Sequence, residues 1–163
     1  MSSSNKSFLY GLELLGRGEP TRDDRIVGST IFALALTSVN LGAYNLYLIK
    51  KIKIFHNAFG WLWASRTVGE IGSNLVHVFY SGPMTIFQPE AIPSWAGISA
   101  FTIGYFFACH ACVMHQLLSL NRMLAVCWPV RYRYIFTKRA CKLLITFCWI
   151  EVFFALSAYL GTL

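Results

Sequence analysis

A cluster of metal-binding residue types lies within one apolar stretch of the chain. Cys109, Cys112 and His115 recur at three-residue intervals, so a helix would place them roughly on one face. Such side chains can bind zinc, but a structural zinc site has four protein ligands, and no fourth is evident here. Small residues of this kind equally suit packing between helices. We therefore expect no metal ion and no other cofactor.

A second constellation is the charged pair Arg66 and Glu70, which are four residues apart in an otherwise apolar run. This spacing places both side chains on the same helical face. Each charge alone would cost roughly 3 kcal/mol at the centre of a bilayer, so a partner or a wet cavity is required. We expect an ion pair within one helix. The alternative is a polar or ion-binding site at the centre of a helix bundle.

Motifs of other chemistries are missing. The sequence contains no glycine loop of the phosphate-binding kind and no evident pairing of a nucleophile with a base, so we do not expect an enzyme. The five cysteines fall within apolar stretches or at their basic ends, and we expect no disulfide. They are Cys109, Cys112, Cys127, Cys141 and Cys148.

The composition indicates a membrane protein. Of the 163 residues, 56% are hydrophobic and only 13% are charged, which is too apolar for an ordinary soluble domain. A helix needs about 20 apolar residues to cross a bilayer. Four windows meet this need, so we expect an all-α integral membrane bundle of four helices. The expected spans are about 26–49, 58–80, 98–126 and 143–163.

Basic residues gather between these expected spans. Three lysines lie in 50–53 and five lysines or arginines in 131–142, whereas 81–97 contains neither residue type. The positive-inside rule then places both basic segments in the cytosol and the polar tail 1–25 outside. Asn5 begins a glycosylation sequon in that tail. Because the basic residues lie between the spans, we attribute the net charge of +7 to membrane topology and expect no nucleic-acid partner.

Two further polar residues lie inside expected spans. Asn40 is in the first and Glu151 is in the fourth. A buried amide or carboxylate in lipid needs a hydrogen-bonding partner, so both side chains should face the bundle.

The segment 120–132 carries the most specific pattern. An apolar run ends in Asn121 and Arg122, and Leu124-Ala125-Val126, Pro129 and Tyr132 follow. This pattern resembles the Asp-Arg-Tyr-Leu-Ala-Val-x-x-Pro-x-x-Tyr signature of rhodopsin-like G-protein-coupled receptors. The acidic first residue is Asn121 here and the tyrosine is Met123. The resemblance implies that Asn121, Arg122, Pro129 and Tyr132 would contact a heterotrimeric G protein.

The same resemblance assigns roles inside the bundle. The outer half of the third helix lines the ligand pocket in these receptors, which implicates Gly104, Tyr105, Ala108 and Cys109. Gly104 stands where amine receptors carry an aspartate, which argues against a cationic amine ligand. Trp149 matches the tryptophan of the fourth helix and would pack in the bundle.

Shorter motifs narrow the resemblance. Asn57-x-Phe59-Gly60, Ser65-Arg66 and Ile135-Phe136-Thr137-Lys138 look like the nematode chemosensory receptors called serpentine receptor class x. This implies that 26–163 is part of a seven-transmembrane receptor domain, with membrane lipid and an unknown small molecule as ligands. A complete receptor of this kind would lie in the plasma membrane.

The sequence stops after the fourth expected span. We expect a receptor-like chain truncated there, which would not signal alone and could be retained in the endoplasmic reticulum. His110, His115 and Asn121 on the third helix would meet lipid unless another receptor chain covered them. The alternative function is a four-span membrane scaffold or subunit that associates with another receptor chain.

Overall fold

The structure is a computed structural model that describes residues 18–89 and 92–161, and these residues form a bundle of helices. Four long helices are joined by short helical turns. In chain order the elements are α1 (Arg22–Lys51), η2 (Lys53–Phe55), α2 (Ala58–Val76), η3 (His77–Ser81), α3 (Gly82–Phe87), α4 (Ser94–Cys127), α5 (Pro129–Ile135) and α6 (Lys138–Gly161). No strand occurs in the described part of the chain.

Helix α1 begins and ends at local signals in the sequence. The Thr21 hydroxyl accepts a bond from the Asp24 amide at 3.2 Å, and the Asp24 carboxylate accepts from the Thr21 amide at 3.0 Å. This capping box satisfies donors that a helix start leaves free. Lys50 and Lys51 occupy the last turn, where positive charge favours the helix dipole.

The second helix extends beyond the expected span. Asn57 caps α2 by accepting from the Gly60 amide at 3.0 Å. At His77 the chain passes into the single π turn η3, and α3 then continues to Phe87. Residues 81–97 were expected to connect the second and third spans, but the first half of this segment is helical. Pro83 allows this because it lies near the start of α3, where proline is tolerated.

Helix α4 has 34 residues, which corresponds to about 51 Å and exceeds the bilayer core. It ends at Cys127, just before Pro129, and Pro129 starts the short helix α5. The expected cytosolic segment between spans is therefore largely helical. Thr137 caps the next helix, since its hydroxyl accepts from the Ala140 amide at 3.2 Å.

Three described helices are long and apolar enough to cross a membrane: Arg22–Lys51, Trp95–Cys127 and Lys138–Ala158. They match the first, third and fourth expected spans. Helix α2 is not among them, since Arg66, Glu70 and Asn74 lower its mean hydropathy. The count of four spans is therefore not established.

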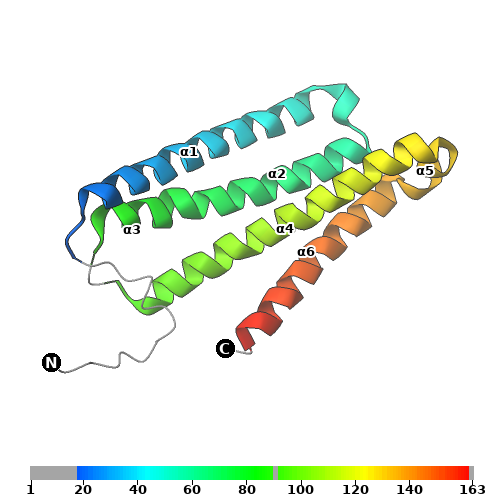
Figure 1. Cartoon of the computed structure of the whole chain (residues 1–163). Helices are drawn as coiled ribbons and strands as arrows, with labels where there is room; N and C mark the ends of the chain where they lie inside the picture. The colour runs from blue at the N-terminus through cyan, green and yellow to red at the C-terminus, as the bar shows by residue number, and fades with distance from the viewer. Residues whose placement is uncertain (1–17, 90–91, 162–163) are drawn as a thin grey trace.

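The long helices lie side by side, and each runs opposite to the next (Figure 1). The start of α1 and the end of α6 lie at one end, which we call the outer end, and η2 and α5 lie at the other, the basic end. A core of Leu62, Met114, Leu118 and Cys148 joins α2, α4 and α6. Large apolar side chains cover the outside, as a lipid environment requires.

Candidate functional site

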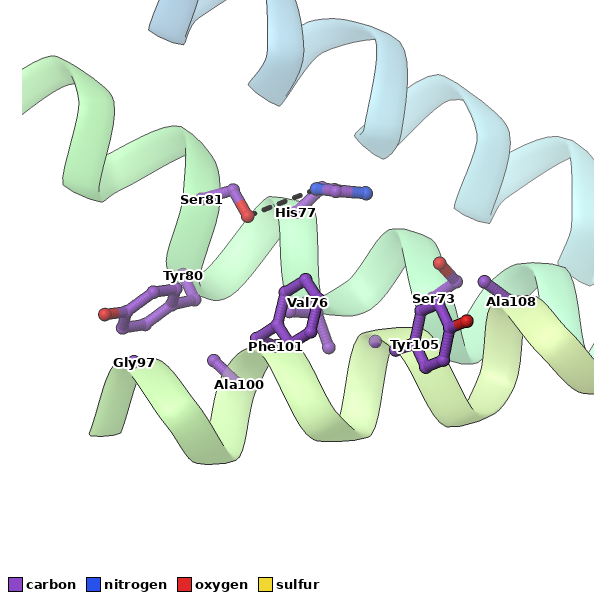
Figure 2. Close-up of a pocket in the computed structure, with 11 residues that line it drawn as sticks. Ser73, Val76, His77, Tyr80, Ser81, Gly97, Ala100, Phe101, Tyr105 and Ala108 are labelled. Carbon is purple, nitrogen blue, oxygen red and sulfur yellow. Dashed lines mark hydrogen bonds between the residues drawn. The ribbon is translucent and has the colours of Figure 1, made fainter. Parts of the chain in front are cut away.

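A cavity of about 240 Å³ lies between α2 with η3 on one side and α4 on the other, toward the outer end. We call it the outer cavity. Figure 2 shows Tyr80 on η3 opposite Gly97 and Ala100 on α4, with Phe101 and Tyr105 one and two turns further along. The lining residues are Ser73, Val76, His77, Tyr80, Ser81, Gly97, Ala100, Phe101, Gly104, Tyr105 and Ala108.

The polar groups of the outer cavity are neutral hydroxyls and one imidazole. His77 Nδ1 and Ser81 Oγ lie 3.2 Å apart across the π turn (Figure 2). The Tyr80 hydroxyl is buried and has no hydrogen-bond partner among the described residues. A buried group of this kind is uncommon and suits a ligand that supplies the missing bond. None of the lining residues is Asp, Glu, Lys or Arg.

Two glycines, Gly97 and Gly104, line the outer cavity on the α4 side and add no side chain to its wall. A Cβ added at Gly104 would lie 3.4 Å from Val76 Cγ1, an ordinary van der Waals contact, so a methyl group fits here but a longer side chain would have to pack against Val76 or extend into the outer cavity. The π turn also changes the direction in which His77 to Ser81 project, and such turns recur at functional sites.

The same two helices pack tightly at the bottom of the outer cavity and one turn below it. A Cβ added at Gly69 would meet the Phe107 carbonyl oxygen at 3.0 Å and the Ala111 nitrogen at 3.1 Å. At Gly72 it would overlap the Phe107 ring. These glycines allow the backbones to approach closely, as small residues do in membrane bundles. Close packing of α2 against α4 at these glycines therefore closes the lower end of the outer cavity, which we call its floor.

Three of the four residues expected near a ligand, Gly104, Tyr105 and Ala108, lie together on the outer cavity. Cys109 does not; it lines a separate cavity of about 330 Å³ between α4 and α6, together with Glu151. Glu151 is exposed although it lines this cavity, so its expected place facing protein stays a prediction. The helical repeat turns Cys109 toward α6, away from the wall that Gly104 and Ala108 share.

A polar contact that the sequence analysis missed joins three helices at the centre. His110 on α4 is fully buried, and its Nε2 lies 3.0 Å from the Ser65 hydroxyl on α2. The imidazole stacks on Trp149 of α6 with ring centroids 3.6 Å apart. The expectation that His110 would meet lipid unless another chain covered it is therefore wrong, because α2 and α6 cover it. Its distance of 45 residues from Ser65 explains why no sequence pattern indicated the contact.

The expected ion pair within α2 is confirmed. Arg66 Nε donates to Glu70 Oε1 at 2.8 Å. His115 of α4 joins the pair, since its Nε2 lies 3.4 Å from the same carboxylate oxygen. The pair is thus partly shielded by a neighbouring helix, although each side chain keeps some exposure. His115, expected to meet lipid, has one polar contact and remains about half exposed.

The signature residues lie together at the basic end. The Tyr132 hydroxyl on α5 donates to the Asn121 carboxamide oxygen at 3.0 Å, and Asn121 is almost fully buried. Asn121 therefore does not face lipid either. Arg122 lies over the Phe59 ring, 5.0 Å from its centroid. Burial raises the pKa of the Tyr132 phenol, and Cys141 adds to the shift.

The remaining expected sites lie as follows. Asn40 is exposed among the described residues and donates to the Leu36 carbonyl oxygen of its own helix at 2.8 Å, so the expectation that it faces the bundle stays a prediction. That bond already satisfies its amide. Asn5 lies outside the described residues. All five cysteines are free, and no group of three or more metal-binding side chains occurs in the described part of the chain.

Comparison with known proteins gives the chain relatives. Residues 32–162 match the family described as Serpentine type 7TM GPCR chemoreceptor Srx. The chain is 29% identical to "Serpentine receptor class X 45" of Caenorhabditis elegans over 124 residues, which are 75% of this chain and 34% of that protein. It is 33% identical to the human "Putative olfactory receptor 10D4" over 57 residues, 34% of this chain and 19% of that one. The chain thus spans about a third or less of these relatives.

Proposed function

The chain belongs to the Srx family of serpentine 7TM GPCR chemoreceptors, and from this premise we propose that it supplies the ligand-binding outer cavity of a chemosensory receptor. The carrying observation is the outer cavity between α2 and α4, which combines an apolar wall with the unpartnered Tyr80 hydroxyl. Its volume of about 240 Å³ is below the roughly 300–1,000 Å³ typical of pockets for drug-sized ligands, so the ligand would be smaller than these.

The ligand we propose is neutral and mainly apolar, with one hydrogen-bonding group. A charged ligand would leave water for a cavity with no opposite charge on its lining residues, which is costly. A carbonyl or hydroxyl could instead bond to Tyr80, with Ser73 or Ser81 as further partners. Gly104 leaves the space for the ligand's apolar part.

We further propose four membrane spans, with α2 as the second. Its charges are paired as Arg66 and Glu70, and α2 packs between α1 and α4 (Figure 1). Pairing lowers the cost of inserting both charges. The basic end would then face the cytosol, because its lysines and arginines lie between spans. Asn121, Arg122, Pro129 and Tyr132 would form the surface that meets a G protein.

Residues 26–163 would need further helices to signal, from the same polypeptide or from another receptor chain. Glu151 supports this proposal, because it is exposed in the middle of a membrane helix. An uncovered carboxylate there would face lipid at a cost of several kcal/mol. A partner helix across the cavity of Glu151 and Cys109 would remove that cost.

The test is binding by the purified chain in lipid nanodiscs. Thermal unfolding would be followed by tryptophan fluorescence with three panels of small molecules: neutral alcohols and ketones, cationic amines, and carboxylates. We expect the neutral panel alone to contain compounds that raise the Tm, and Tyr80→Phe to weaken those effects. Stabilisation by amines or carboxylates, and none by neutral compounds, would contradict the proposal.

A further inference from the structure

A second cavity, at the basic end, is the largest of the three described and has a different character. Its volume is about 560 Å³, and we call it the basic cavity. It lies where the end of α1 meets the starts of α2 and α6. Its lining residues are Leu46, Ile49, Lys50, Phe55, His56, Gly60, Trp61, Ala64, Lys138 and Lys142.

Three lysines from two helices converge on the basic cavity. Lys50 lies in the last turn of α1, and Lys138 and Lys142 lie on one face of α6, one turn apart. The Lys142 ammonium lies 5.5 Å from the centroid of the Trp61 ring on α2, so its side chain reaches across from α6. Like charges one turn apart destabilise a helix unless an anion lies between them.

The sequence offers these lysines no nearby carboxylate. No Asp or Glu occurs between Asp24 and Glu70, or between Glu90 and Glu151. Glu70 already pairs with Arg66. The basic cavity thus holds three positive charges and no negative one on its lining residues. Its charge is complementary to a multivalent anion.

The other half of the lining is apolar. Leu46, Ile49 and Phe55 lie beside the lysines, and Trp61 is partly exposed at the same place. Lysine next to tryptophan at a helix end is typical of a membrane interface. His56 donates to the Lys50 carbonyl oxygen at 3.1 Å, which fixes the turn against α1 without using the Lys50 ammonium.

We propose that the basic cavity binds a membrane lipid with a phosphorylated headgroup of the phosphoinositide class. The lysines would contact the phosphates, and the apolar wall would contact the glycerol and the first carbons of the acyl chains. Basic pockets between membrane helices have the chemistry that such headgroups require. A free soluble anion would use the lysines but gain nothing from Trp61 and Ile49.

The test is a lipid titration of the purified full chain followed by native mass spectrometry, with phosphatidylinositol bisphosphate as the probe and phosphatidylcholine as the reference lipid. We expect the double variant Lys138→Gln with Lys142→Gln to bind the probe about 30-fold more weakly. The matched control is Lys51→Gln with Lys53→Gln, which removes the same charge from residues outside the lining. Equal losses in both variants would indicate diffuse surface attraction and overturn the proposal.

Two further arms cover the remaining outcomes. Ala64→Leu keeps every charge but fills part of the basic cavity, so it should weaken probe binding even if the lysine variant fails to fold. Unchanged affinity in Ala64→Leu would place the lipid elsewhere. Soluble inositol trisphosphate should compete poorly, because it lacks acyl chains. Competition as strong as that of the intact lipid would identify a free phosphate compound as the occupant and reject the lipid.

Discussion

The two halves of the α2–α4 helix pair differ in how closely they pack. Toward the basic end, Leu62 on α2 and Met114 on α4 are both fully buried. Toward the outer end the same helices line the outer cavity, and Val76 and Gly104 are among its walls. Both halves are rich in apolar and small residues, so composition alone does not make the difference. The halves differ instead in the backbone of the outer half, which contains the π turn η3 and places Gly97 and Gly104 of α4 on the cavity wall. The shape of the backbone therefore contributes to this cavity.

The largest effect should come from removing volume in the packed half. Leu62→Ala should lower the free energy of unfolding by about 2–5 kcal/mol, because its fully buried side chain leaves a void among close-packed neighbours. Val76→Ala, beside an existing cavity, should cost clearly less. The measurement is unfolding in mixed micelles by titration with sodium dodecyl sulfate. Equal losses would mean that the two halves do not differ in packing.

The Arg66–Glu70 pair lies just below the floor of the outer cavity, and its loss comes next. Glu70→Gln should lower the unfolding free energy by about 2 kcal/mol, less than for a fully buried pair because both side chains retain some exposure. Adding Arg66→Gln should recover part of that loss, since no unpaired charge remains. A double-mutant cycle measures the coupling. If the cycle gave no coupling energy, His115 or another partner would carry the interaction.

The close helix contact gives a third, smaller effect. Gly69→Ala should cost about 1–2 kcal/mol, because the new Cβ meets backbone atoms of α4 at 3.0 and 3.1 Å and the helices must move apart. Gly104→Ala is the matched change in the open half and should be nearly neutral, since its Cβ meets Val76 at 3.4 Å. Thermal unfolding of both variants in nanodiscs compares them. A cost at Gly104 as large as that at Gly69 would refute the comparison.

The smallest effect is at Tyr132. Tyr132→Phe should cost about 1 kcal/mol, because the Asn121 carboxamide loses a donor while it stays buried. The phenol has a raised pKa, so the neutral form is favoured in the folded state. Its contribution is therefore complete below pH 10, the usual pKa, and is lost as the pH rises through the higher folded value. Wild type and Tyr132→Phe should differ less in stability at strongly alkaline pH; a constant difference would argue against this bond.

Local sequence signals predicted much of the fold. Apolar length located α1, α4 and α6, and the four-residue spacing predicted the Arg66–Glu70 pair. Features that depend on packing between helices could not be predicted from the sequence. The π turn at His77–Ser81 was not predicted, nor was the stacking of His110 on Trp149, which depends on how α6 packs against α4. The bond from the Asn40 amide to the backbone of its own helix was not predicted either.

The candidate site was predicted in part for the same reason. The family resemblance implicated Gly104, Tyr105, Ala108 and Cys109, and the first three lie together on the outer cavity, whereas Cys109 does not. The opposite wall, with Ser73, His77 and Tyr80, was not predicted, because nothing in the sequence indicates which face of α2 meets α4. That wall supplies the polar groups.

The central claim is that the outer cavity binds a small neutral ligand, and filling it is the most direct test. Gly104→Leu should fill part of the cavity beside Val76, and Gly104→Ala, whose Cβ makes only an ordinary contact with Val76 at 3.4 Å, is the control. In nanodiscs, neutral compounds that raise the Tm of the wild type should still do so for Gly104→Ala and should have no effect on Gly104→Leu. An undiminished Tm shift in a folded Gly104→Leu variant would contradict the account.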